Sequence, residues 1–266
     1  MRRIITLALA GLLAVGMTLA LTSCQKEKDT LVCGITDFDP MNYRDNSGEW
    51  TGFDTELAKL VGEKLNMTVK FQEIQWDSKY MELESGAISC IWNGFTANAT
   101  ESDDTPRSDK VDFSYCYMLN QQSIVIKADR ASEFTSADSL LGMTAAAESG
   151  SAGEGEAAGL VGEDGSVLGV SAQVNTLLEV KAGAVDCAVI DILLAERLAG
   201  TGDYSDLMIA DITLGHEFYA IGFPKGSDLT DKVDKALKEL YDAGKMMELA
   251  EKYGLQDSLI LETFRG

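Results

Sequence analysis

The chain has 266 residues, with 43 acidic and 22 basic side chains and a formal net charge of −21. Such a composition leaves no basic surface for phosphates, which argues against binding to nucleic acid. A single histidine, His216, and the lack of any Cys-x-x-Cys pair leave no credible zinc or haem site, so no metal or cofactor is expected. The length allows one large domain or two small ones.

The N-terminus has the pattern of an export signal. Three residues, Met-Arg-Arg, supply a short basic start, and an apolar run follows over residues 4–21. The run ends in Leu-Thr-Ser-Cys, which resembles the bacterial lipobox, where the chain is cut before the cysteine and the cysteine is acylated. We therefore expect a lipoprotein signal peptide over 1–23, lipid on Cys24 and a tether over 24–30. The alternative is an uncut membrane anchor helix.

The first part of the exported chain predicts a parallel β-α-β unit. Residues 31–35 form an apolar strand, and Leu57, Val61 and Leu65 recur at helical spacing on one stripe. Residues 67–71 then alternate apolar and polar, which indicates a second strand. This order of elements favours an α/β fold with helices on the faces of a sheet.

A nine-residue pattern occurs twice. Residues 82–90 read ELESGAISC and residues 179–187 read EVKAGAVDC, each a helix end, a glycine and the start of a buried strand. The first strand is expected at 87–92, and a small-residue turn follows it at 93–97. The second strand is expected from about 187 to Asp191. A unit used once in each half indicates two similar α/β lobes; chance is the alternative.

The second half continues with alternating strands and helices. Strands are expected at 123–127 and 142–147, and helices at 136–141 and 174–180. Residues 150–169 are rich in glycine, so we expect no stable helix there and a mobile segment. Near the end, Val233, Leu237, Leu240 and Tyr241 fall on one helical face, Gly244 stops that helix, and a last helix runs through Tyr253.

Several stretches, taken together in their order and spacing, resemble the extracellular solute-binding proteins of polar-amino-acid ABC importers. They are Pro40-Met41-Asn42-Tyr43 with Gly48, Gly52-Phe53-Asp54 with its helix, residues 76–88, Arg107 with Val111-Asp112-Phe113-Ser114, residues 183–191 and residues 237–254. The resemblance implies a type II periplasmic-binding fold, with two α/β lobes, two hinge segments and a ligand cleft. The implied bounds are 31–117 with 218–266 for lobe 1, 123–211 for lobe 2, and 118–122 with 212–217 for the hinge.

The same resemblance implies a site for a free amino acid. Arg107 matches the arginine that grips the ligand carboxylate, a role that suits the planar guanidinium, and Asp191 matches the carboxylate for the ammonium group. Further ligand-binding residues are Thr96, Gly94, Ser151 and Ala152, and the walls are Phe38, Met41 and Trp76. The alternatives are a surface arginine at 107, a helix N-cap at 191 and core positions for the three wall residues.

Some residues depart from the family pattern. The loop before Arg107 is longer than usual, Ala152 offers no hydroxyl, and Glu154 and Glu156 stand near the expected carboxylate site. Four cysteines follow Cys24, and an exported protein permits a disulfide among them, although the apolar runs around three of them favour buried thiols.

The resemblance implies a lipid-anchored monomer on the extracellular face of the membrane that delivers an amino acid to an ABC permease. The alternatives are an enzyme on the same fold, of the prephenate dehydratase type, and a ligand-sensing subunit. A dehydratase needs a general acid and a basic pocket for a dicarboxylate, and the sequence offers one candidate pocket arginine.

Overall fold

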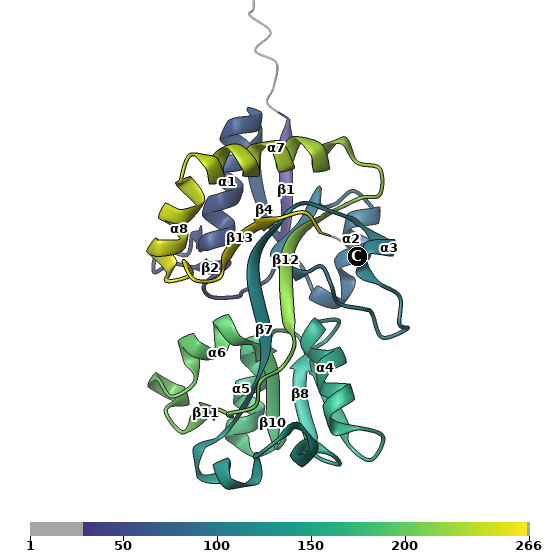
Figure 1. Cartoon of the computed structure of the whole chain (residues 1–266), viewed down its shortest axis with the longest axis vertical. Coiled ribbons are helices and arrows are strands. Elements are labelled where there is room, and N and C mark those ends of the chain that lie inside the picture. Colours follow the sequence, from purple (N-terminus) through teal and green to yellow (C-terminus); the bar gives the residue numbers. More distant parts are fainter. Residues whose placement is uncertain (1–28, 265–266) are drawn as a thin grey trace, which may run out of the picture.

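The computed structural model describes residues 29–264 and shows two α/β lobes, one above the other in Figure 1. The signal peptide over 1–23, Cys24 and most of the tether lie outside the described residues. None of the helices within 29–264 is long and apolar enough to cross a membrane. The α/β class and the two-lobed fold expected from the sequence are confirmed.

The first lobe is built on a mixed sheet in the order β4-β1-β5-β12-β7, in which β7 (Cys116–Lys127) also continues into the second lobe. β1 is parallel to β4 and β5, whereas β12 is antiparallel to β5 and β7. The strands of this lobe are β1 (Thr30–Ile35), β4 (Thr68–Glu73), β5 (Cys90–Thr96), β6 (Asp112–Phe113), β12 (His216–Phe223) and β13 (Leu259–Glu262), with a small separate hairpin of β2 (Tyr43–Arg44) and β3 (Trp50–Thr51). Its helices are α1 (Phe53–Leu65), α2 (Lys79–Glu84), α3 (Arg107–Lys110), α7 (Asp228–Asp242) and α8 (Lys245–Tyr253).

The second lobe repeats this plan with the order β7-β10-β8-β9. β8 is parallel to both β10 and β9, and β7 is antiparallel to β10. The strands are β8 (Thr144–Glu148), β9 (Ser166–Val170), β10 (Cys187–Asp191) and β11 (Leu207–Ile209), and the helices are α4 (Ala152–Val161), α5 (Gln173–Ala182) and α6 (Ile192–Leu198). Short 3₁₀ turns occupy Trp76–Ser78, Ala128–Glu133, Ala137–Leu140 and Gly202–Tyr204.

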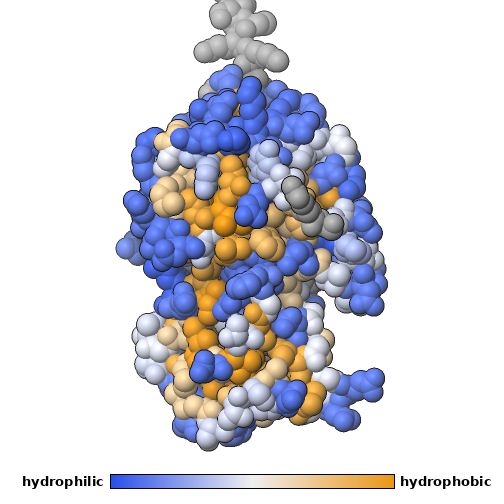
Figure 2. All heavy atoms as spheres, viewed as in Figure 1, coloured by the Kyte–Doolittle hydropathy of each residue, from blue (hydrophilic) through white to orange (hydrophobic). Residues whose placement is uncertain are grey.

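Both sheets are covered by helices on two faces, so their strands are largely buried. In the first lobe α1, α7 and α8 pack together on one side, and α2 lies on the other (Figure 1). Figure 2 shows hydrophilic residues over much of the outer rim of both lobes, with hydrophobic residues gathered along the middle of this face. Tyr241, expected on the apolar face of α7, is 40% exposed, so that placement was wrong.

Two segments connect the lobes. The first is β7 (Cys116–Lys127), a single long strand whose residue Gln121 pairs with His216 of β12, while the next residue, Gln122, pairs with Asp191 of β10. The second leads from β11 into β12 (Figure 1). The hinge segments expected at 118–122 and 212–217 lie at this crossing, and the exact bounds of hinges and lobes stay predictions.

The repeated pattern forms the same unit in both lobes. α2 leads through Gly86 into β5, and α5 leads through Gly183 into β10. Both glycines have φ near +75°, a left-handed conformation that ends each helix. β5 and β10 are both central strands, so the repeat is a structural one, as expected.

The turn expected at 93–97 was wrong, because β5 continues through Thr96. Gly94 leaves room for a close approach of neighbouring groups, and the Asn93 side chain donates to the Thr36 hydroxyl at 2.6 Å. A Cβ on Gly94 would lie 2.7 Å from the ring of Phe38, and the Gly94 N–H donates to the carboxylate of Asp54 at 2.8 Å. Small residues in a strand can mark such a close approach as well as a turn.

The glycine-rich stretch does contain a helix, so that expectation was also wrong. The Ser151 hydroxyl accepts from the N–H of Glu154 at 3.0 Å and caps α4. Gly153 packs so tightly that a Cβ there would lie 2.8 Å from both the Gln122 amide oxygen and the Val189 carbonyl. Close packing against β7 and β10 therefore outweighs the poor helix propensity of glycine.

The four cysteines within 29–264 are buried, unpaired thiols. Cys33 and Cys90 face each other on neighbouring strands with their sulfur atoms 3.8 Å apart. The interpretation of Cys33, Cys90 and Cys187 as small buried hydrophobic residues agrees with this placement.

Candidate functional site

The predicted site residues converge on one small cavity between the lobes. It is lined by Trp76, Asn93, Gly94, Thr96, Arg107, Gln122, Glu148, Ser151, Ala152, Gln173 and Asp191. Phe38 and Met41 are not brought to it; both are buried in the hydrophobic core of the first lobe, which was their alternative placement. The cavity measures about 10 Å³, room for about one water molecule, so the lobes are closed on each other here.

Arg107 opens α3 and is buried, with 1% of its surface exposed. Its Nε donates to the Glu101 carboxylate at 2.9 Å, and one terminal nitrogen donates to the Thr96 carbonyl at 3.2 Å. The other terminal nitrogen crosses to the second lobe and donates to the Gly150 carbonyl at 3.3 Å. A surface arginine is therefore excluded, and the long loop before α3 supplies the carboxylate that orients it.

Lys79 is a second buried cation that the sequence did not reveal. Its Nζ donates to the same Gly150 carbonyl at 2.8 Å and lies 3.9 Å from the Glu101 carboxylate. Burial, with the charge of Arg107, lowers the pKa of Lys79 to about 8. Lys79, at the start of α2, and Arg107, at the start of α3, thus both donate to the same backbone carbonyl of the second lobe. A lysine on a short helix carries no sequence signal for this role.

Asp191 ends β10 and is held in place by four donors. The Tyr219 hydroxyl and the amide nitrogen of Asn120 donate to one carboxylate oxygen at 2.5 Å each, joined by Gln122 at 3.1 Å, and Gln173 donates to the other at 2.5 Å. Burial raises the pKa of Asp191, and these hydrogen bonds oppose the rise. Asp191 occupies the N-cap position of α6, but its side chain accepts no capping hydrogen bond, so the N-cap alternative is excluded.

Two further buried carboxylates, Glu217 and Glu148, stand beside Asp191. Glu217 accepts from Thr96, Asn120 and Gln122 at 2.7–3.3 Å, and burial together with the nearby Asp191 charge raises its pKa to about 7. Glu148 ends β8, and burial followed by the Asp191 charge raises its pKa to about 8. Neither was predicted, because each comes into place only through pairing of strands far apart in the sequence.

Ser151 and Ala152 begin α4 at the edge of the cavity. The Ser151 hydroxyl is used in the helix cap, and the Gly150 N–H donates to the Glu154 carboxylate at 2.8 Å. Glu154 is thereby tied to the backbone around the start of its own helix. The backbone amides at this N-terminus face a region where the helix dipole favours an anion.

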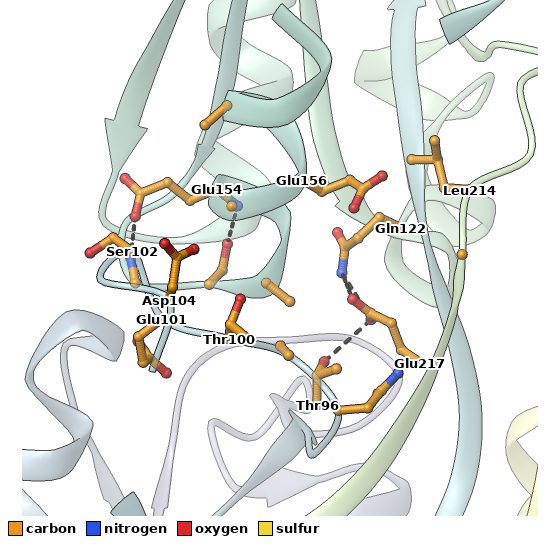
Figure 3. A pocket seen from close by; sticks show the side chains of 18 of the residues that line it. Thr96, Thr100, Glu101, Ser102, Asp104, Gln122, Glu154, Glu156, Leu214 and Glu217 are labelled. Carbon is orange, nitrogen blue, oxygen red and sulfur yellow. Dashed lines mark hydrogen bonds between the residues drawn. The ribbon is translucent and has the colours of Figure 1, made fainter. Parts of the chain in front are cut away.

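A larger acidic pocket of about 580 Å³ opens next to the cavity and shares Thr96, Gln122, Ser151 and Ala152 with it. Figure 3 shows the carboxylate side chains that surround it, from the loop before α3, from α4 and from β12. They are Glu101, Asp104, Glu154, Glu156 and Glu217. No lysine or arginine of the described residues lines this pocket. Glu101 is paired with Arg107 and Lys79 from behind the pocket wall, so the field that favours a cation comes from the other carboxylates.

The residue types and their geometry suit a small zwitterion. Arg107 comes from one lobe and Asp191 from the other, and both border one cavity. An opening motion of the lobes would enlarge that cavity and free the guanidinium and carboxylate faces. Among the described residues there is no cluster of three or more His, Cys, Asp or Glu side chains arranged to hold a metal ion.

Comparison with known proteins gives a family and a fold. A profile of the bacterial extracellular solute-binding proteins, family 3, matches residues 31–256. The arginine-binding extracellular protein ArtP of Bacillus subtilis (strain 168) is 31% identical over 253 residues, 91% of this chain and 95% of ArtP. A solved ancestral arginine-binding protein bound to arginine is 28% identical with a TM-score of 0.78, over 85% of this chain and 99% of that one.

A second solved structure bears on the alternative of an enzyme. The ancestral amino acid-binding protein AncCDT-1, described as a precursor of cyclohexadienyl dehydratase, is 28% identical with a TM-score of 0.74. The match covers 84% of this chain and 95% of that chain. The similarity is to a protein described as binding amino acids.

Proposed function

The chain belongs to the bacterial extracellular solute-binding proteins of family 3, and we propose that it captures one amino acid between its lobes and delivers it to an ABC permease. One observation carries the proposal: a buried arginine of the first lobe and a buried carboxylate of the second, Arg107 and Asp191, line the same cavity. A free amino acid carries the two complementary charges, an ammonium and a carboxylate, on the same α-carbon.

Arg107 would hold the ligand carboxylate. Its Nε donates to Glu101 and one terminal nitrogen donates to the Thr96 carbonyl, both within the first lobe. The other terminal nitrogen donates to the Gly150 carbonyl of the second lobe, and this nitrogen is the one that can donate to a ligand instead. The amides at the start of α4, at Ser151 and Ala152, would complete the carboxylate site. Asp191 would hold the ammonium group, with Thr96 and Gly94 on the opposite wall.

Ligand entry requires the lobes to separate, because the present cavity of about 10 Å³ is far smaller than any amino acid. We infer a hinge motion at 118–122 and 212–217, where both connecting segments cross. Residues 31–117 and 218–266 would move as one lobe and 123–211 as the other. Lys79, which donates to Gly150 across the cleft, would close behind the ligand.

The proposed setting is the outer face of the cell membrane. Lipid on Cys24 and a tether over 24–30 would keep the monomeric binding protein near its permease. We favour a binding protein over a dehydratase, because Arg107 is the only arginine among the described residues lining the cavity and a dicarboxylate needs a more basic pocket.

Thermal unfolding of the purified protein with each of the twenty amino acids tests the proposal. A ligand present at a hundred times its Kd should add about 2.7 kcal/mol of stability. For a chain of this size that corresponds to a rise in Tm of about 5–10 °C. If none of the twenty raises the Tm, amino-acid capture is refuted.

A further inference from the structure

We propose that Glu148 selects amino acids with a positively charged side chain by holding the second cation of the ligand. The inference rests on the proposed function and names its substrate class. It starts from the placement of Glu148, which is 3% exposed and lines the same cavity as Arg107 and Asp191. No motif or pattern in the sequence marks this residue.

Strand geometry brings Glu148 and Asp191 to one edge. β8 and β10 are parallel neighbours, with Ala145 and Ala146 paired to Cys187 and Ala188, and each strand ends in its carboxylate. Ligands in open α/β sheets bind outside the carboxyl ends of such strands. Glu148 is therefore positioned toward the same bound molecule as Asp191.

Glu148 differs from the other carboxylates of the cleft in lacking partners. Asp191 accepts hydrogen bonds from four side chains and Glu217 from three, whereas the buried Oε1 of Glu148 has no hydrogen-bond partner among residues 29–264. A buried acceptor without a partner is costly unless a ligand supplies one. Glu148 thus carries an unused binding capacity.

A purely structural role as the partner of Lys79 does not fit the geometry. The Nζ of Lys79 donates to the Gly150 carbonyl and lies within 4 Å of the Glu101 carboxylate, and no ion pair joins it to Glu148. Arg107 is likewise engaged by Glu101. Both cations of the cleft therefore make their hydrogen bonds and ion pairs elsewhere, and the carboxyl group of Glu148 has no cationic partner within ion-pair distance among the described residues.

The charges of a bound amino acid decide what that group is. The carboxylate and ammonium of the ligand would match Arg107 and Asp191, so neither of these ligand groups supplies the counter-charge that Glu148 needs to ionise in a closed, dry cleft. A cationic side chain supplies it. Trp76 lines the same cavity, and the Nζ of Lys79 lies 5.3 Å from its ring centroid, so this ring already borders one cation.

The neighbouring acidic pocket supports the same choice. Its carboxylates, which surround the opening in Figure 3, would attract a cationic ligand toward the cleft and repel an anionic one. This attraction is diffuse, whereas Glu148 borders the cavity itself. Selection among bound ligands is therefore assigned to Glu148.

Titration calorimetry with L-arginine and L-citrulline tests the inference, because citrulline has nearly the shape of arginine without its charge. The parent should bind arginine at least about tenfold more tightly than citrulline. Glu148→Gln should weaken arginine binding at least about tenfold and bring the two Kd values together. Glu148→Asp keeps the charge and should keep the preference for arginine.

Glu163→Gln is the matched control, since it removes one exposed carboxylate from the turn after α4, and it should leave both Kd values unchanged. The inference is overturned if Glu148→Gln weakens both ligands equally, or if the parent prefers citrulline or another neutral amino acid. Those results would leave amino-acid capture standing. A parent that binds no amino acid at all would refute the proposed function itself.

Discussion

Gly150 allows a direct test of lobe closure, because it belongs to the second lobe and touches the backbone of the first. A Cβ at this position would lie 2.9 Å from the Cα of Asp77, and 3.4 Å from its Cβ and N. The nearest of these atoms belongs to the main chain, so it cannot turn aside as a flexible side chain could. Gly150→Ala should therefore hinder the closed state without disturbing the core of either lobe.

The expected loss follows from two effects. Gly150 has φ of +75°, and an alanine there costs about 1–2 kcal/mol of backbone strain in the open and closed states alike. The clash with Asp77 arises only on closure and should cost about 1–3 kcal/mol, as overpacking does elsewhere. Only this second effect weakens binding, by about 5- to 150-fold in Kd.

Gly142→Ala provides the matched control. Gly142 lies in the same lobe with φ of +77°, but a Cβ there would meet no atom within 4 Å. Calorimetry and small-angle scattering, with and without a ligand found by thermal screening, should show tight binding and compaction for this control. Gly150→Ala should show weaker binding and less compaction. Equal Kd values and equal compaction in the two variants would refute closure at this contact.

Three further predictions concern single groups. Asp191→Asn removes the negative charge that would hold the ligand ammonium and places an amide among four donors, so it should lower ligand affinity by about 1–3 kcal/mol, measured by calorimetry on protein that thermal unfolding shows to be folded. Burial raises the folded-state pKa of Asp54 and of Glu217 to about 7 and that of Glu148 to about 8. These pKa values lie above those of the unfolded chain. The native state therefore holds more protons than the unfolded chain between about pH 4.5 and 7. Stability without ligand should therefore fall as pH rises through that window, and Tm should be higher at pH 5.5 than at pH 8 by about 2–4 °C or more; an unchanged Tm would contradict these pKa shifts. Cys24→Ala should release the protein from the membrane fraction in detergent partition, and equal retention through an uncut segment would refute lipid anchoring.

The sequence was most informative where a local pattern corresponds to a buried element. The repeated helix–glycine–strand unit predicted two similar lobes, because both Gly86 and Gly183 end helices in a left-handed conformation before central strands. Arg107 and Asp191 were singled out by family resemblance and charge, and the structure places both at one cavity. Their contact with a ligand stays a prediction.

The failures arise where tertiary packing decides what glycine and small residues do. Gly94 and Gly153 look like a turn and a helix breaker in sequence, yet each permits a close approach inside a regular element. Lys79 and Glu148 were missed for a related reason. Their partners and cavity come from strands and helices far apart in the chain, and neither residue type carries a local signal of burial.

Titration calorimetry of the parent protein and Arg107→Ala, with the amino acid that raises the Tm most, tests the central claim most directly. We predict one ligand bound per chain, and a Kd about thirty- to a thousand-fold weaker in Arg107→Ala because the charge-assisted contact with the ligand carboxylate is lost and the partly buried Glu101 loses its partner. Arg107→Lys should recover only part of the affinity, since an ammonium cannot contact Glu101, Thr96 and a ligand with three separate nitrogens as the guanidinium does. Circular dichroism should first show that both variants are folded. Arg107→Ala binding the amino acid as tightly as the parent would contradict capture of the ligand carboxylate by this arginine.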